Sequence, residues 1–174
     1  MLKTLIAIIY ATYQHRGQKR RISNKAYIMH PLAAGYTLYK CGYSYDVVIA
    51  GILHNVLEDC GVSAKKMSKI FGGRITMLVR TVTNTDENYQ SAPEHMSIAT
   101  LSIKTADTIS NVSDYMKYDG GVSDSKLYSY YHFLNESYQI LKAYRTGPSM
   151  RLARKAYLTA KALNISSRRY LRRI

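Results

Sequence analysis

The sequence predicts an all-α fold. Apolar residues recur at i, i+3, i+4 and i+7, the spacing of one helix face, as in Ile75, Leu78, Val79 and Val82. The alternation of apolar and polar residues that is typical of a strand is nowhere sustained. With 174 residues the chain can bury one hydrophobic core, and no internal repeat divides it. We therefore expect a single helical domain over residues 1–174.

Three helices are expected in the first part of the chain. Pro31 fits the first turn of the second helix, where its missing N–H is no loss, and this places His30 at the helix cap. Gly61 ends the third helix. The expected ranges are 2–15, 31–41 and 45–59, with a basic loop over 16–25.

Serine, glycine and proline residues set the helix ends in the rest of the chain. Ser63 and Ser97 are N-cap residues, and Gly120-Gly121 and Gly147-Pro148 are breaks between helices. The polar stretch 83–95 is expected to form a lid or a loop. The expected helices cover 64–72, 74–82, 98–112, 124–145 and 149–163.

The charge of the chain favours an anionic partner. Lys and Arg number 25 against 11 Asp and Glu, which gives a net charge of +14. Ten of the basic residues follow Ser137, where no acidic residue remains. Such a basic helix and tail fit a nucleotide, a nucleic acid or a membrane surface, and charge alone does not choose among them.

Cysteine content and hydropathy indicate a cytoplasmic protein without a membrane span. Cys41 and Cys60 show neither metal-type spacing nor a disulfide framework, so a reducing compartment is expected. The apolar run from Leu5 to Tyr10 is too short to span a membrane and lacks a cleavage site for a signal peptide.

Four side chains able to hold a metal or move a proton lie in the expected helix 45–59. His54 and Glu58 are one turn apart, as are Asn55 and Asp59, so a continuous helix would place all four along one strip. Their neighbours are almost all apolar, and such groups are costly to bury unless they are paired or bind a cation. The strip therefore predicts a metal or proton-transfer site.

Five sequence motifs resemble the hydrolase domain of the RelA/SpoT family, and in length the chain is most similar to its small, single-domain Mesh-type alarmone hydrolases. The motifs occur in the order and at nearly the spacing of that family. They are His15-Arg-Gly-Gln-Lys-Arg20, Tyr27-Ile-Met-His30-Pro31, Ala50 to Asp59, Phe71-Gly72 ahead of Leu78-Val79 and Val82-Thr83, and Lys104-Thr-Ala-Asp107 with Asn111.

The resemblance implies a helical HD-type domain that binds one Mn²⁺ and removes the 3′-pyrophosphate from guanosine tetra- or pentaphosphate. Some animal relatives also accept NADPH. By position, Glu58 and Asp59 match the acidic pair that activates water. The family's metal ligands fall on His30, His54, Asn55 and Asp107.

The resemblance also implies a nucleotide pocket. Arg20, Arg21 and Lys126 match cationic positions that hold the diphosphate, and Arg20 could also stack on the base. Asn111 and Tyr130 match positions that line the pocket.

The chain departs from the family at Asn55, where the HD signature has aspartate. An amide oxygen is a neutral and weaker ligand for a hard dication than a carboxylate. The asparagine could have been introduced to silence the enzyme, could mark a natural pseudoenzyme, or could be tolerated. We favour the first two, which predict weakened metal binding and impaired turnover.

Two alternatives to the hydrolase remain. One is a catalytically silent module that sequesters or senses a nucleotide. The other is nucleic-acid binding through the basic C-terminus, which ranks lower because that helix also carries residues expected to pack in the core. Those residues are Leu152, Ala153, Ala156 and Leu163.

Overall fold

The computed structural model describes residues 2–83, 92–118 and 122–171, with side chains up to residue 163. Most of the expected loop 83–95, the Gly120-Gly121 break and the basic tail 168–173 lie outside the described backbone or side chains. Within the described ranges the chain is helical and has no strand beyond one antiparallel bridge between Lys19 and Ala26. The predicted all-α fold class is confirmed.

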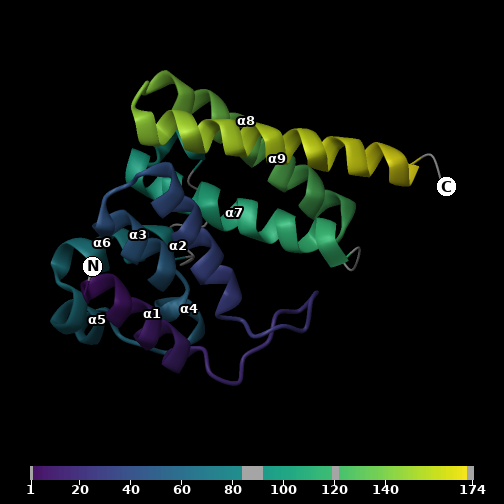
Figure 1. Ribbon diagram of the computed structural model, residues 1–174. Helices are drawn as coiled ribbons and strands as arrows, with labels where there is room; N and C mark the ends of the chain where they lie inside the picture. Colours follow the sequence, from purple (N-terminus) through teal and green to yellow (C-terminus); the bar gives the residue numbers. More distant parts are fainter. Residues whose placement is uncertain (1, 84–91, 119–121, 172–174) are drawn as a thin grey trace.

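The helices form two groups joined by α2 (Figure 1). The long helices α7, α8 and α9 pack along one another, α1, α3, α5 and α6 gather on the other side, and α2 contacts α3, α7 and α9. The bounds are α1 Leu2–Gln14, α2 Met29–Cys41, α3 Tyr45–Leu53, α4 Val56–Asp59, α5 Ala64–Phe71, α6 Gly73–Val82, α7 Ile98–Tyr118, α8 Asp124–Ala143 and α9 Gly147–Leu171, with a short 3₁₀ helix at Pro93–His95.

Helix α3 runs through the centre of the main core. Every residue from Val47 to Leu53 is buried, as expected for a helix that is apolar on all sides. A smaller cluster between α7, α8 and α9 includes Val112, Leu127 and Leu134. The core positions expected on the last helix are confirmed, since Leu152, Ala153, Ala156 and Leu163 are buried.

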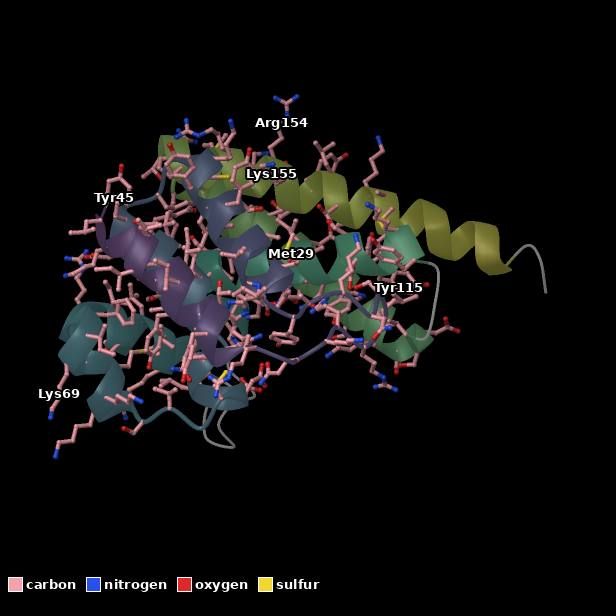
Figure 2. All side chains as sticks on the ribbon, turned by 60° about the horizontal axis from the view of Figure 1, so that its bottom comes forward. Met29, Tyr45, Lys69, Tyr115, Arg154 and Lys155 are labelled. Atoms are coloured by element: carbon pink, nitrogen blue, oxygen red, sulfur yellow. The ribbon has the colours of Figure 1, made fainter. Side chains whose placement is uncertain are left out.

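The basic side chains of α9 do not all face the same way, since Arg151 Nε donates a hydrogen bond to the Cys41 carbonyl oxygen of α2 at 2.8 Å. Figure 2 shows Arg154 at the edge of the molecule, where its side chain points away from it. Among the described helices, none is long and apolar enough to cross a membrane.

The prediction of one continuous helix over 45–59 is wrong. Helix α3 ends at Leu53 and the short helix α4 begins at Val56. His54 Nδ1 lies 2.7 Å from the carbonyl oxygen of Gly51, which the N–H of residue 55 would bind in a continuous helix. The imidazole competes for that acceptor, so the expected strip is broken between its histidine and its carboxylates.

Other expected helix ends also differ from the structure, since α7 continues to Tyr118 and α9 to Leu171. Helix α2 begins at Met29 with Ile28 as its N-cap, so His30 lies in the first turn and not at the cap. Gly147 and Pro148 begin α9 instead of separating two helices. Thr146 and Ser149 exchange hydrogen bonds there, and proline is well suited to a first helical turn. The expected caps at Ser63 and Ser97 do accept backbone N–H groups, from Lys66 and Thr100.

Two glycines allow α2 and α3 to pack closely. A Cβ atom on Gly51 would lie 2.5 Å from Leu38 Cδ1, and one on Gly35 would overlap the side chain of Ile52. The close approach fixes the end of α3, which carries His54.

We expect Gly51→Ala to lower the free energy of unfolding by about 1–3 kcal/mol, because the added methyl group overpacks the contact with Leu38. Gly73→Ala is the control, since no atom of the described structure outside its own helical turn lies within 4 Å of its Cβ position. Urea denaturation of both variants measures the difference. Equal stabilities would show that the close packing of α2 on α3 is not required.

Candidate functional site

Two histidines and an aspartate from separate helices meet at one point. His30 lies in α2, His54 follows the end of α3, and Asp107 lies in α7. His30 Nε2 is 3.0 Å from Asp107 Oδ1, and His54 Nε2 is 3.7 Å from the same oxygen. One candidate ligand atom of each residue lies within 4.8 Å of the others. The structure therefore brings together three of the four expected metal ligands.

Each imidazole is oriented by a contact to its second nitrogen. His54 Nδ1 lies 2.7 Å from the Gly51 carbonyl oxygen, so it is the nitrogen that donates. His30 Nδ1 lies 2.9 Å from Ser110 Oγ. Both Nε2 atoms are thereby directed toward Asp107. Metal-bound histidines in proteins are commonly held in this way.

The donor set fits a divalent cation. His54 Nε2 is buried and finds no hydrogen-bond partner among the described residues, which is costly for a polar atom. Two imidazoles and one carboxylate are common ligands of transition metals. A cation bound among them would satisfy the buried nitrogen.

The charges in this cluster favour a positive ion beside Asp107. Burial would raise the pKa of Asp107, but contacts from His30 and His54 outweigh it and hold this pKa well below its usual range. Burial lowers the pKa of His30. Burial also acts to lower the pKa of His54, yet the contact with the Asp107 carboxylate raises it overall. The carboxylate is therefore ionised and attracts positive charge.

Asn55, the fourth expected ligand, lies in the break between α3 and α4. Its Nδ2 donates a hydrogen bond to the hydroxyl of Tyr27. That hydroxyl donates in turn to Asp59 Oδ2 at 2.8 Å. The asparagine is thus connected to the acidic pair through a tyrosine.

The acidic pair lies at the surface beside the cluster. Glu58 and Asp59 are exposed in α4, and the backbone carbonyl of Asp59 accepts a hydrogen bond from Gln18 Nε2 at 3.1 Å. Lys104 lies one turn before Asp107 in α7. Burial lowers the pKa of Lys104, while Asp107 and Glu58 act to raise it. A lysine therefore lies within electrostatic reach of both the cluster and the acidic pair.

All five residues expected to bind the nucleotide line one groove next to the cluster. The groove has a volume of about 480 Å³. Its lining is rich in cationic and aromatic side chains. The lining residues are Lys19, Arg20, Arg21, Ile22, Tyr27, Asn111, Val122, Ser123, Lys126 and Tyr130.

A hydrogen-bond chain joins the groove to the cluster. Arg20 donates from Nε to Asp114 at 3.1 Å and from its guanidinium NH2 nitrogen to Asn111 Oδ1 at 3.0 Å. Asn111 Nδ2 then donates to Asp107 Oδ1 at 2.8 Å. The groove arginine is therefore held rigidly and linked to the aspartate of the cluster.

Sequence reasoning assigned no site role to several residues that the structure places here. Ser110 and Asp114 are three and seven residues after Asp107 on the same helix, and this spacing could have indicated them. Tyr27 was part of a motif, but its link between Asn55 and Asp59 has no local signal.

The chain belongs to the HD domain family, whose sequence pattern matches residues 7–113. It is similar to a guanosine-3′,5′-bis(diphosphate) 3′-pyrophosphohydrolase of Borreliella burgdorferi, with 34% identity over 113 residues. It is also similar to a probable enzyme of the same name from Synechocystis, with 35% identity over 86 residues. These matches cover 65% and 49% of this chain but only 16% and 11% of the longer relatives.

Two solved structures share the fold. One, described as a metazoan ortholog of SpoT that hydrolyzes ppGpp, aligns with a TM-score of 0.74 at 23% identity, over 93% of this chain and 96% of its own. The other, lmo0812 from Listeria monocytogenes, has a TM-score of 0.61 at 22% identity, over 81% of this chain and 99% of its own.

From this cluster we predict that a divalent cation stabilises the folded protein. At a Mn²⁺ concentration about 100-fold above Kd, binding should add about 2.7 kcal/mol to the free energy of unfolding. His54→Gln should abolish this increase, because it removes a buried ligand. His132→Gln, which alters a ring that lies tilted against Tyr128 on α8, should retain it. Thermal denaturation with and without the ion measures each protein against itself, and an equal gain in both variants would contradict the site.

Proposed function

We propose that the protein is a metal-dependent pyrophosphohydrolase that releases pyrophosphate from guanosine tetra- or pentaphosphate or a related purine nucleotide. The observation that carries the proposal is the His30, His54 and Asp107 cluster beside a cationic groove. The similarity to guanosine-3′,5′-bis(diphosphate) 3′-pyrophosphohydrolases supports this substrate class.

The proposed cofactor is one Mn²⁺. His30, His54 and Asp107 would hold it, with Asn55 as a fourth ligand through its amide oxygen. A divalent cation there would supply a water molecule of lowered pKa. An amide at position 55 is expected to weaken the ion, because it lacks the negative charge of a carboxylate.

Glu58 and Asp59 are the proposed catalytic residues. Both are carboxylates at the surface end of the cluster, where an attacking water could reach them. Asp59 would take the proton from that water, and Glu58 would help to orient it. The hydrogen bond from Tyr27 to Asp59 Oδ2 leaves the other oxygen to accept a proton.

The groove is proposed to bind the nucleotide. Arg20, Arg21 and Lys126 supply positive charge for phosphate oxygens. Arg20 is already fixed by Asp114 and Asn111, so it can contact the ligand without a large loss of side-chain freedom. Tyr130 adds an aromatic wall beside Lys126, whose Nζ lies 5.2 Å from the ring centre.

Asn55 favours one alternative, a protein that binds the nucleotide without turning it over. This alternative predicts that the chain binds guanosine tetraphosphate in calorimetry but releases no pyrophosphate, even at high Mn²⁺. Turnover by the unaltered chain would remove it.

We expect Asn55→Asp to raise Mn²⁺ affinity by about tenfold or more, ~1.4 kcal/mol, and to increase pyrophosphate release from guanosine tetraphosphate. Calorimetry and a pyrophosphate assay measure the two effects. Asn135→Asp is the control, because it adds the same charge to α8, where the Asn135 side chain bonds to the Tyr131 carbonyl. No Mn²⁺ binding and no hydrolysis of any nucleotide by the Asn55→Asp variant would refute the enzyme.

Two lysines of α8 allow a matched test of the groove. Lys126 lies over Tyr130 inside the groove, and Lys142 lies over Tyr138, 5.4 Å from the ring centre and outside it. Lys126→Ala should raise KM for guanosine tetraphosphate by about tenfold through the lost charge-assisted contact, with Mn²⁺ affinity unchanged. Lys142→Ala should leave KM unchanged. Equal effects on KM would mean that general positive charge, and not this groove, attracts the nucleotide.

A further inference from the structure

We propose that Tyr27 is a positioning residue that joins Asn55 to Asp59, so that one hydroxyl orients both a metal ligand and the catalytic base. The inference rests on the proposed function and deepens it. It concerns Asn55, the residue at which the chain departs from the HD signature, and the tyrosine hydrogen-bonded to it.

The ring of Tyr27 is fixed by its neighbours. The His15 ring lies 4.9 Å from it and the His30 ring 5.9 Å, measured between ring centres. The Arg20 guanidinium lies 6.0 Å from the ring centre. The hydroxyl is therefore held in one position, where it contacts Asn55 Nδ2 and Asp59 Oδ2.

The chemistry of the three groups fixes the direction of both hydrogen bonds. A phenol has one proton, and an ionised carboxylate can only accept, so the Tyr27 proton goes to Asp59. The tyrosine oxygen can then only accept from position 55. The amide N–H of Asn55 meets that requirement, and its Nδ2 is the atom found there.

This direction has a consequence for the metal. An amide nitrogen has no lone pair to offer a cation, so asparagine can serve as a ligand only through Oδ1. By accepting the N–H, Tyr27 prevents a flip of the Asn55 side-chain amide and keeps Oδ1 available for a cation. The neutral residue at 55 is thus held in its one useful orientation.

The same direction has a consequence for Asp59. Its Oδ2 is occupied by the Tyr27 proton, which leaves Oδ1 as the atom that accepts a proton from water. An aspartate at position 55 would be a second acceptor for the single tyrosine proton. It would compete with Asp59 for that proton, so the position of Asp59 would depend less on Tyr27.

The test is a double-mutant cycle of Tyr27→Phe and Asn55→Asp in the full chain. Tyr27→Phe keeps the ring between His15 and His30 and removes only the hydroxyl. With Asn55 present it should lower kcat for pyrophosphate release by about 10–100-fold and leave KM for guanosine tetraphosphate nearly unchanged. In the Asn55→Asp background the same change should lower kcat by less than about threefold. There the Tyr27 proton is already divided between the carboxylates at positions 55 and 59, so less is lost with the hydroxyl.

Tyr138→Phe is the matched control. Tyr138 packs against Tyr157 outside the groove, so loss of its hydroxyl should leave kcat unchanged. An equal loss of kcat from Tyr27→Phe in both backgrounds, or a change confined to KM, would overturn the proposal.

A second measurement needs neither metal nor substrate. In urea denaturation of the metal-free proteins, Tyr27→Phe should lower the midpoint more with Asn55 than in the Asn55→Asp background, since only the amide forms the directed pair. Equal shifts would show that the link does not exist. If no protein of the cycle releases pyrophosphate, the proposed function fails and the role in hydrolysis with it, whereas the urea midpoints still decide whether Tyr27 and Asn55 are coupled.

Discussion

The rest of the site depends on the contacts that three side chains make with the Asp107 carboxylate. His30, His54 and Asn111 all direct a nitrogen at its Oδ1 atom, from two other helices and from the next turn of its own. An ionised carboxylate in this position is stable only with positive charge or hydrogen-bond donors around it. The close packing of α2 on α3 at Gly35 and Gly51 supplies this arrangement, because it brings the two histidines to the face of α7.

The cluster of His30, His54 and Asp107 and the groove are parts of one hydrogen-bonded network. Asn111 bonds to Asp107 on one side and to Arg20 on the other, and Asp114 completes the support of the arginine. A ligand that shifts Arg20 would therefore also change the hydrogen bond from Asn111 to Asp107. Preorganisation of this kind lowers the entropy lost on binding and holds catalytic groups in a narrow range of positions.

Local sequence signals predicted most helices, yet they could not predict how the site is arranged. The helical period and the caps at Ser63 and Ser97 gave correct elements because these depend on neighbours in the chain. The break after His54 could not be read from period, because it depends on which nitrogen of the imidazole reaches the Gly51 carbonyl. The family resemblance did imply that the two histidines meet Asp107. It gave no sign of the hydrogen bond from Tyr27 to Asp59, because that bond depends on α4 packing against the loop before α2.

The central claim is that His30, His54 and Asp107 form one cation site, with Asn55 presenting its amide oxygen beside them. The most direct measurement is anomalous diffraction at the manganese edge from crystals soaked in Mn²⁺. The account predicts one strong peak within bonding distance of both Nε2 atoms and an Asp107 oxygen. A peak only elsewhere, or none with the three side chains in place, would contradict it.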